Sequence, residues 1–319
     1  VPPRVHPGPK LLKTLLGRSL ALPCVAHGDP MPRLSWYKDG AALRVGDQDS
    51  LPGPDGTISV LEVQRLDSGL YRCVAFSSAG EDALEFRLEV LEPPNFKENS
   101  DILLEHTMYE PVTVTCPVQG TPTPMIRWLK NGVVLSSNLP GITQLANGSL
   151  VIDSPAPNNS GDYICLATNE AGSARRKTKL VVYAPPRILE NGQAQNISLM
   201  ANQPLILGCE VSGVPFPTVT WNREDRILTE GPGISFQSAG QSLRFHRIRK
   251  EDSGSYTCRA VNRAGEAQRT FNVMVFVPPT IYGAGSLQEL TAKEGDEVEL
   301  HCRTSGLPTP QVEWTKDEQ

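Results

Sequence analysis

The sequence predicts an all-β protein of tandem β-sandwiches arranged end to end, and three observations lead to this prediction. The phrase Tyr-x-Cys occurs three times, and each of its Cys residues stands 49 residues after an earlier Cys. A Trp follows each earlier Cys by 12 positions. Pro-Pro pairs recur every 91 to 93 residues along the 319-residue chain. A Cys, a Trp and a Tyr-x-Cys at fixed offsets are typical of one two-layer sandwich of about 100 residues.

The period of the repeats places the domain boundaries. Pro-Pro pairs begin at Pro2, Pro93, Pro185 and Pro278. We therefore predict three complete domains at 1–91, 92–183 and 184–276, and the truncated start of a fourth at 277–319. The linkers contain no Gly/Ser spacer, and Pro-rich segments are extended and semi-rigid. We expect stiff joints, with each domain contacting only its neighbours in the chain.

The strand that carries the first Cys of a repeat alternates apolar with small or polar residues, as in Leu20, Leu22 and Cys24. Alternation of period two predicts a strand with one buried face, which places the Cys in the core. A Gly-x-Pro-x-Pro loop follows in every repeat, beginning at Gly28, Gly120, Gly213 and Gly306. Pro has no backbone donor, so the strand cannot continue and the chain is expected to turn.

The next strand is expected to place a Trp in the core of each repeat: Trp36, Trp128, Trp221 and Trp314. The hairpin dipeptides Asp39-Gly40 and Asn131-Gly132 follow in the first two repeats. A short apolar strand then precedes the Tyr-x-Cys strand, whose Tyr is expected to form a tyrosine corner: Tyr71, Tyr163 and Tyr256. Each repeat closes on an alternating strand, and no helical periodicity of useful length occurs.

Six of the seven cysteines are expected to form one disulfide within each complete repeat: Cys24 with Cys73, Cys116 with Cys165 and Cys209 with Cys258. Cys302 opens the fourth repeat and is expected to be unpaired because of truncation, so we assign it no function. Paired cysteines at identical spacing favour an oxidising compartment over a reduced cytoplasmic array. A bridge that closes about 50 residues stabilises a domain by ~4 kcal/mol in the chain-entropy model.

The repeats resemble tandem I-set immunoglobulin domains along the whole chain. The residues of the first repeat that carry the resemblance are Ile58, Val60, Val63, Asp67, Gly69, Tyr71 and Cys73. A Cys-x-Ala-x-Asn-x-x-Gly phrase follows at Cys165 and Cys258. The second repeat departs by having Asn159 and Pro155 in this pattern, and the first repeat lacks the Asn. These departures concern the local turns and leave the expected fold unchanged.

The joints resemble those of the hemicentins, because the Pro-Pro pairs after Ala184 and Val277 are followed two residues later by Ile188 and Ile281. The resemblance implies a secreted segment of an extracellular-matrix or cell-adhesion protein, found in basement membrane or at cell junctions. Its expected partners are other extracellular proteins or itself. Roundabout-type receptors, contactin-type adhesion molecules and peroxidasin carry similar arrays. The alternatives are therefore a signalling or axon-guidance receptor ectodomain on the plasma membrane, or the arm of a matrix enzyme.

Catalysis and metal binding find no support in the sequence. The five His residues are scattered over four repeats, without ligand residues at metal spacing and without a catalytic motif. We predict no enzyme activity, no catalytic residue, no metal and no cofactor. The net charge of −5 gives no support for nucleic-acid binding. No apolar run approaches the ~20 residues of a membrane helix, so no membrane insertion is expected within this segment.

Three Asn-x-Ser sequons predict N-glycosylation if the chain is secreted. They begin at Asn147, Asn158 and Asn196. Asn158 stands beside the tyrosine-corner turn, where crowding is expected to disfavour modification. We therefore expect Asn147 and Asn196 to be modified in preference to Asn158, although such short motifs also occur by chance.

A basic run forms one outward face of a predicted strand. Arg175, Lys177 and Lys179 alternate along it, with Arg176 on the opposite face. Two interpretations are open: a binding patch for glycosaminoglycan or another acidic partner, or a charged edge strand that discourages aggregation.

Overall fold

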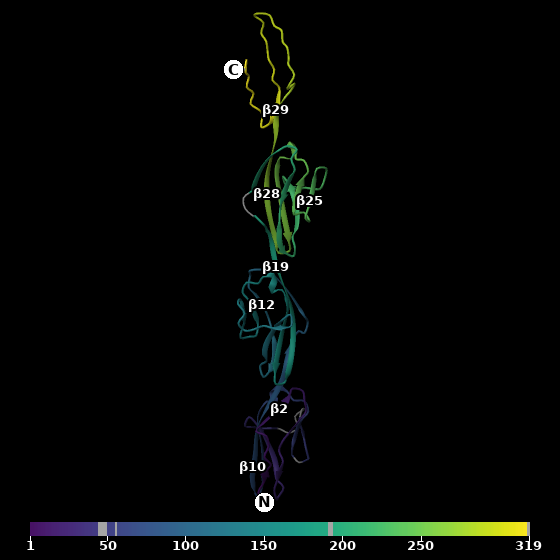
Figure 1. The fold of residues 1–319 in the computed structure, drawn as a ribbon. Helices are drawn as coiled ribbons and strands as arrows, with labels where there is room; N and C mark the ends of the chain where they lie inside the picture. The colour runs from purple at the N-terminus through teal and green to yellow at the C-terminus, as the bar shows by residue number, and fades with distance from the viewer. Residues whose placement is uncertain (44–49, 55, 191–193, 318–319) are drawn as a thin grey trace. The chain divides into compact units, whose positions relative to one another are not determined.

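The computed structural model describes residues 1–43, 50–54, 56–190 and 194–317, and the predicted all-β class is confirmed (Figure 1). The described residues form strands, loops and short 3₁₀ turns. They divide into two compact units. The first consists of Val1–Leu104, Pro111–Ser154 and Ser160–Leu180, and the second of Glu105–Glu110, Pro155–Asn159 and Val181–Gln319. The joint between repeats one and two lies inside the first unit, and the joint between repeats two and three inside the second.

The first repeat is a sandwich of two sheets. Its elements are β1 (Arg4–Val5), β2 (Leu11–Leu15), β3 (Leu20–Leu22), β4 (Ala26–His27), β5 (Arg33–Lys38), β6 (Ala41–Ala42), β7 (Ser50–Pro52), β8 (Ile58–Val60), η1 (Arg65–Asp67), β9 (Gly69–Ser77) and β10 (Gly80–Phe96). One sheet has the order β10-β9-β5-β6, with β2 parallel to β10, and the other has the order β3-β8-β7. The short strands β1 and β4 pair with each other.

The second repeat repeats this arrangement. Its elements are β11 (Ile102–Thr107), β12 (Val112–Val114), β13 (Val118–Thr121), β14 (Met125–Lys130), β15 (Val133–Val134), β16 (Ile142–Gln144), β17 (Leu150–Ile152), η2 (Pro157–Asn159), β18 (Gly161–Asn169) and β19 (Gly172–Ile188). The sheets have the orders β11-β19-β18-β14-β15 and β12-β17-β16.

The third repeat again has two sheets, of order β20-β28-β27-β23-β24 and β21-β26-β25. Its elements are β20 (Gln195–Met200), β21 (Leu205–Gly208), β22 (Val211–Val214), β23 (Thr218–Arg223), β24 (Arg226–Ile227), β25 (Ile234–Gln237), β26 (Ser242–Phe245), η3 (Lys250–Asp252), β27 (Gly254–Asn262) and β28 (Gly265–Ile281). The last strand of the described chain is β29 (Thr304–Leu307), which pairs with β28.

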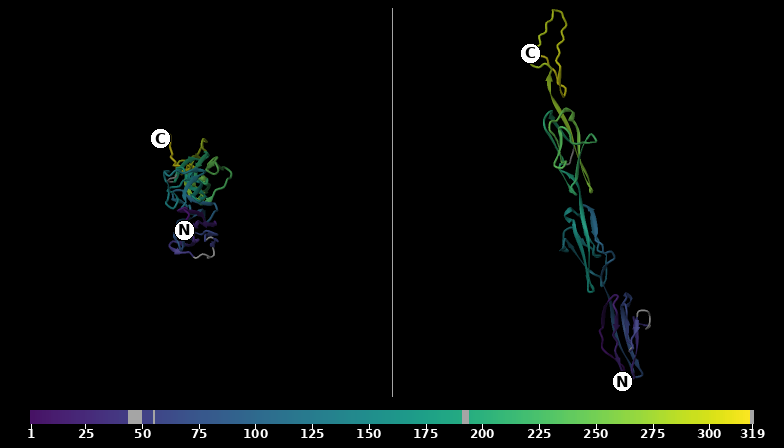
Figure 2. Two further views of the ribbon diagram at one scale, coloured as in Figure 1. Left: turned by 90° about the horizontal axis from the view of Figure 1, so that it is seen from below. Right: turned by 90° about the vertical axis from the view of Figure 1, so that its right-hand side faces the viewer.

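The core of each sandwich follows from alternation along its strands, because successive side chains point to opposite faces. In β9 the residues Tyr71, Cys73 and Ala75 are at most 3% exposed, whereas Arg72 between them is exposed. The equivalent strands β18 and β27 bury the same three positions. The apolar face of each sheet is thus directed at its partner sheet, and the two layers can be followed in the views of Figure 2.

The strand that closes one repeat continues as the first strand of the next. The strands β10, β19 and β28 are each 17 residues long and contain the Pro-Pro pair. Before the pair, β10 is antiparallel to β9 of the first repeat. After it, β10 is antiparallel to β13 of the second repeat. The predicted boundaries at 91, 183 and 276 therefore fall inside continuous strands, and their positions stay a prediction.

The prediction that Trp314 is a core residue is wrong, because 59% of its surface is exposed. Trp36, Trp128 and Trp221 are buried between two sheets, and each stands opposite a Cys of a Tyr-x-Cys strand. Trp314 lies outside the strands of the described residues, so no opposing strand among them covers its indole.

Candidate functional site at the joints between repeats

The Pro-Pro pair interrupts strand pairing at the same place in each joint. In β10 the register shifts between Glu92 and Asn95, where Pro93 and Pro94 lie. The same shift occurs between Ala184 and Arg187 in β19 and between Val277 and Thr280 in β28. Proline has no N–H to give to the ladder, so the pair can lie in a strand only where pairing is broken.

An asparagine side chain fastens the interrupted strand of the first joint. Asn169, at the end of β18, donates two hydrogen bonds from Nδ2, one to the carbonyl of Glu92 at 2.7 Å and one to that of Pro122 at 2.9 Å. Its Oδ1 accepts the backbone N–H of Ala171 at 2.9 Å. One amide therefore joins the linker, the Gly-x-Pro-x-Pro loop and the turn between β18 and β19.

The second joint repeats this connection with Asn262. Its Nδ2 donates to the carbonyls of Ala184 at 2.8 Å and Pro215 at 2.9 Å, and its Oδ1 accepts from Ala264 at 2.8 Å. In the first repeat Ser77 takes this position, and its hydroxyl accepts only the local bond from Ala79 at 3.1 Å. A hydroxyl lacks the two N–H groups of an amide, so it cannot fasten two carbonyls in this way.

The first glycine of the Gly-x-Pro-x-Pro loop leaves room for this connection. A Cβ on Gly120 would lie 2.9 Å from Cγ of Pro124, 3.1 Å from Nδ2 of Asn169 and 3.3 Å from the carbonyl oxygen of Glu92. A Cβ on Gly213 would lie 2.9 Å from Cγ of Pro217, 3.1 Å from Nδ2 of Asn262 and 3.3 Å from Cα of Pro186. A glycine is required because two side chains and one backbone segment pack closely against this position.

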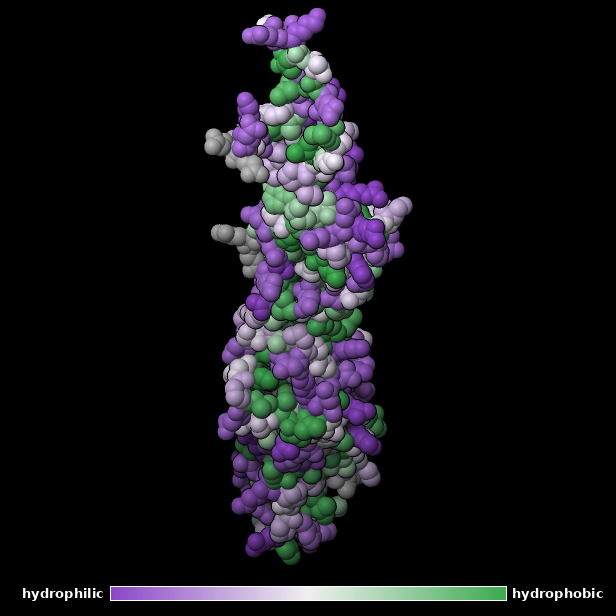
Figure 3. Space-filling view, turned by 45° about the horizontal axis from the view of Figure 1, so that its top comes forward, coloured by the Kyte–Doolittle hydropathy of each residue, from purple (hydrophilic) through white to green (hydrophobic). Residues whose placement is uncertain are grey.

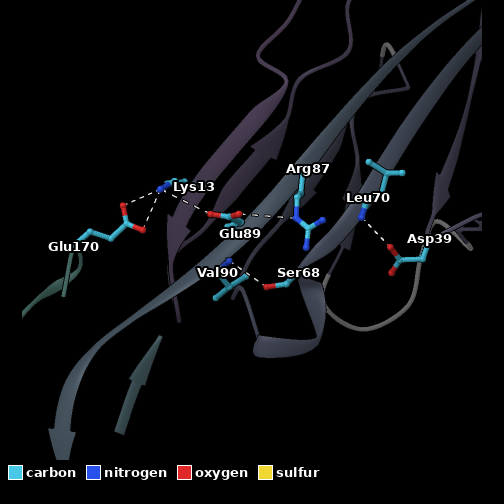
Figure 4. Close-up of polar contacts among 8 residues, drawn as sticks. All are labelled: Lys13, Asp39, Ser68, Leu70, Arg87, Glu89, Val90 and Glu170. Atoms are coloured by element: carbon cyan, nitrogen blue, oxygen red, sulfur yellow. Dashed lines mark hydrogen bonds and ion pairs between the residues drawn. The ribbon is translucent and has the colours of Figure 1, made fainter. Parts of the chain in front are cut away.

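Charged side chains join the first repeat to the turn of the second (Figure 4). Nζ of Lys13, on β2, lies 2.8 Å and 3.0 Å from the two carboxylate oxygens of Glu170, in the turn after β18. The bond to Glu170 raises the pKa of Lys13 above its ordinary value. Arg65 of η1 also binds Glu92 of the linker, with Nη2 2.6 Å from Oε2.

The second joint has an ion pair at the same two positions, with an aromatic ring added. Nη2 of Arg263 lies 3.0 Å from Oε2 of Glu105, on β11. The hydroxyl of Tyr183 donates to Oε1 of Glu105 at 2.7 Å, and this bond raises the pKa of Tyr183. The Arg263 guanidinium lies 4.7 Å from the centre of the Tyr183 ring, within the range of a cation–π contact.

The structure joins all six cysteines that the sequence pairs. The Cα–Cα distances are 6.4 Å for Cys24–Cys73, 6.1 Å for Cys116–Cys165 and 6.5 Å for Cys209–Cys258. Each bridge connects the two sheets of one sandwich. Cys302 is a free thiol of intermediate exposure.

Each core Trp of the complete repeats also makes a repeated hydrogen bond. Nε1 donates to a glycine carbonyl, from Trp36 to Gly56, from Trp128 to Gly148 and from Trp221 to Gly240. These three glycines have φ between +84° and +85°, a conformation that other residues rarely adopt. The indole is therefore buried without leaving its donor unsatisfied.

The tyrosine corners lie where the sequence places them. The hydroxyl of Tyr71 donates to the carbonyl of Asp67, and that of Tyr256 to the carbonyl of Asp252, both at 2.7 Å. Tyr163 is fully buried. Burial raises the pKa of Tyr71, and it raises the pKa of Tyr163 and of Tyr256 to about 12.

The two departures of the second repeat preserve its 3₁₀ turn. Oδ1 of Asn159 accepts the backbone N–H of Ala156 at 2.8 Å. The carboxylate of Asp67 accepts the equivalent bond from Gln64 at 2.7 Å in the first repeat. Pro155 is buried where the first repeat buries Val63. An amide oxygen and a proline ring thus replace a carboxylate and an apolar side chain.

All three sequon asparagines are exposed. The exposure of Asn158 gives no support to the expectation that crowding disfavours its modification. Preferential modification of Asn147 and Asn196 stays a prediction. Oδ1 of Asn147 accepts the backbone N–H of Ser149 at 3.0 Å, and Oδ1 of Asn196 accepts Nδ2 of Asn272 at 3.0 Å.

The basic run lies on β19, with Arg175 and Lys179 exposed. Nζ of Lys177 is 3.1 Å from a carboxylate oxygen of Asp101, which raises the pKa of Lys177. Arg176 is 8% exposed and its Nη2 lies 4.0 Å from Glu98. Its Nε has no hydrogen-bond partner among the residues that the structure describes. In its sheet β19 lies between β11 and β18. In the equivalent pairs of the other repeats, the parallel neighbour begins at Arg87 and at Phe271, positions that correspond to the end of the basic run. The edge-strand interpretation therefore stays a prediction. Whether the run binds glycosaminoglycan stays a prediction.

Other kinds of site find little support in the described residues. No group of three or more His, Cys, Asp or Glu side chains in the described ranges lies close enough together for a metal ion. Within the same part of the chain, no helix has the length and apolar character needed to cross a membrane. On the face shown in Figure 3, hydrophobic residues are interspersed with hydrophilic ones. The joints are therefore the most structured polar sites, and we treat them as the candidate functional site.

Comparisons with known proteins agree with this architecture. The family model "Immunoglobulin I-set domain" matches residues 3–90, 190–275 and 284–319, and the model "Immunoglobulin domain" matches residues 93–169. The chain is 45% identical to Hemicentin-2 of Mus musculus over 330 residues, covering 100% of this chain. It is 39% identical to Hemicentin-1 of Homo sapiens over 322 residues, covering 99% of this chain. The chain spans 6% of the length of each of these relatives.

A solved structure described as an I-band fragment from titin has the same fold. It superimposes with a TM-score of 0.66 at 25% identity, covering 86% of this chain and 99% of that chain.

Proposed function

Because this chain belongs to the immunoglobulin I-set family, we propose that it is a non-catalytic spacer in an extracellular-matrix or cell-adhesion protein. In this role it holds binding surfaces apart and contacts other extracellular proteins or copies of itself. The similarity to hemicentins over the full chain supports the matrix assignment. The role in basement membrane or at cell junctions belongs to the same proposal.

One observation carries the spacer role: one strand runs through each joint, and its pairing is broken only at the Pro-Pro pair. A linker of flexible residues would let neighbouring sandwiches reorient freely. Here β10 pairs with strands of two repeats. Where its pairing is broken, Asn169 donates a hydrogen bond to the carbonyl of Glu92. The linker therefore has few torsion angles left to vary, which is the property that a spacer requires.

The disulfides support the extracellular assignment. Bridges of this kind persist in secreted and cell-surface proteins, whereas the cytosol keeps thiols reduced. Three Cys pairs within reach of a disulfide favour this assignment over a reduced array of the muscle type.

The proposed function is tested by secreting the chain from mammalian cells and coating it onto beads. Binding to a reconstituted basement-membrane matrix and aggregation of beads with one another report the two partner classes. We expect at least one of these interactions, and we expect it to resist washing. A chain with Gly-Ser residues inserted between Leu91 and Glu92 is the control for the spacer role, because it keeps every sandwich surface. Absence of both interactions in the unaltered chain would contradict the proposal.

The basic face of β19 offers a second class of partner. Arg175 and Lys179 are exposed on the same face, and Lys177 between them is held by Asp101. We propose glycosaminoglycan as the ligand of this face, with Arg175 and Lys179 supplying most of the available charge. The triple variant Arg175→Ala, Lys177→Ala, Lys179→Ala should elute from a heparin column at lower salt than the unaltered chain. Elution at the same salt would exclude this site.

A further inference from the structure

The joint between repeats one and two and the joint between repeats two and three carry ion pairs of opposite polarity at equivalent positions. Lys13 stands 11 residues before the first Cys of its repeat, and Glu105 stands 11 residues before the first Cys of the next. Their partners Glu170 and Arg263 each stand five residues after the second Cys of the following repeat. The cation is thus on the preceding repeat in the first joint and on the following repeat in the second.

The same two positions are neutral elsewhere in the chain. Ser78 occupies the turn position of the first repeat, and Ser198 occupies the strand position of the third. In each of the two pairs the facing charges are opposite, although the sign at each position differs between the two joints. The strand position therefore has no fixed sign of its own, and its sign is opposite to that of the turn it faces.

We propose that the turn of each repeat docks on a strand of the preceding repeat, with charge polarity specifying which neighbours fit. The second repeat supplies the carboxylate in both joints. Glu170 pairs with Lys13 of the first repeat, and Glu105 pairs with Arg263 of the third. If the second and third repeats exchanged places, Arg263 would face Lys13, and like charges at this distance repel. The partner class of each docking surface is therefore an adjacent repeat of complementary charge.

Because of Tyr183, the second docking surface is more selective than the first for the kind of cation that it binds. Its hydroxyl binds the carboxylate of Glu105 and its ring faces the Arg263 guanidinium. The first joint has Leu91 at the equivalent position, 92 residues earlier, which can supply neither contact. The second joint thus selects a planar cation, since guanidinium groups stack on aromatic rings. The first joint requires only a positive charge near Glu170.

This inference rests on the proposed spacer role, because it explains how neighbouring repeats keep their orientation. It is tested by double electron–electron resonance on the full chain in a Cys302→Ser background. Spin labels attached at Ala41→Cys and Val133→Cys report the first joint. Both positions are exposed and lie outside the docking surfaces. The width of the distance distribution measures how tightly the joint is held.

We expect Lys13→Glu to broaden the distribution, because it adds a third carboxylate beside those of Glu89 and Glu170. Exposed ion pairs change such an equilibrium by about 1.5- to 5-fold. The double variant Lys13→Glu, Glu170→Arg carries the polarity of the second joint and should restore the original width. The matched control is Arg72→Glu, which makes the same change of net charge at an exposed position of β9, a strand that carries none of Lys13, Glu89 and Glu170.

The outcomes separate the inference from the proposed function. Two results would contradict the proposal that charge polarity specifies the neighbour. One is a distance distribution of unchanged width in Lys13→Glu, and the other is a distribution as broad in the double variant as in the single variant. The same result would leave matrix binding unaffected, since the bead assay measures that property independently. Circular dichroism of each variant, compared with the unaltered chain, verifies that the sandwiches remain folded. A distance distribution that broadens in the single variant and returns to its original width in the double variant would establish that charge polarity holds this joint.

Discussion

Asn169 connects three segments through one side chain, which makes it the most informative single residue of the first joint. Its two N–H groups bind the carbonyls of Glu92 and Pro122, and its oxygen binds the backbone of Ala171. A residue of another type cannot offer two donors and one acceptor in so small a volume.

We expect Asn169→Ala to destabilise the second repeat by about 1–3 kcal/mol, because two carbonyls lose their donors. The free energy of unfolding from urea titration measures the change. Thr168→Ala is the matched control, since Thr168 is the adjacent exposed residue on the same strand. Equal losses in the two variants would show that the amide bonds contribute nothing.

The buried tyrosines predict loss of stability at high pH. Burial raises the pKa of Tyr163 and of Tyr256 to about 12, whereas an unfolded tyrosine titrates near pH 10. Above pH 10 the unfolded chain loses these protons while the folded chain keeps them, so unfolding becomes easier. The stabilising contribution is complete below pH 10 and is lost as the pH rises to about 12.

Urea midpoints measured in steps across this window should fall steadily, and tyrosinate absorbance should rise together with unfolding. In Tyr256→Phe the third repeat should show a shallower fall, because one titrating group has been removed. A midpoint independent of pH between 10 and 12 would contradict this account.

At the scale of single elements, the loop that begins at Gly120 depends on close packing rather than on an unusual backbone angle. We expect Gly120→Ala to destabilise the second repeat by about 1–3 kcal/mol, the usual cost of overpacking. The new Cβ would meet Pro124 and Asn169. Thermal unfolding followed by circular dichroism measures the effect.

Gly208→Ala is the control for this prediction, because nothing lies within 4 Å of the Cβ that it adds. That substitution should change stability little. If the two alanine variants melted together, close packing at Gly120 would not be the reason for the glycine.

The elements that sequence reasoning predicted well are those fixed by spacing within a repeat. Cys24, Trp36 and Tyr71 share one sandwich, and their offsets recur, so their burial followed directly from alternation. Trp314 was placed wrongly. Apolar and polar residues alternate around it as in a buried strand, but burial also requires an opposing strand. The neighbours of β19 within its sheet could not be predicted, since they are not visible in a local pattern.

The charge pairs at the joints were missed for a related reason. Lys13 and Glu170 lie in different repeats, and no pattern within one repeat brings them together. Alignment of the repeats would have revealed the exchanged signs at Glu105 and Arg263. It would not have shown that the turn of one repeat reaches the strand of its predecessor.

For the whole molecule, the disulfides predict the number of reactive thiols. Under denaturing, non-reducing conditions we expect one thiol for each chain, from Cys302, because the other six cysteines are bonded. Thiol titration with a chromogenic disulfide reagent measures this number. The Cys302→Ser variant should give none. Seven thiols in freshly isolated protein would contradict both the bridges and the extracellular assignment.

The continuous strand through each joint also has a mechanical consequence. When the chain is pulled, the strand that leaves one sandwich transmits the tension directly into the next, with no slack segment to straighten first. The Pro-Pro pair has no ladder bonds to lose, so the hydrogen bonds on either side of it bear the load. Each sandwich should therefore resist stretching from the onset of force.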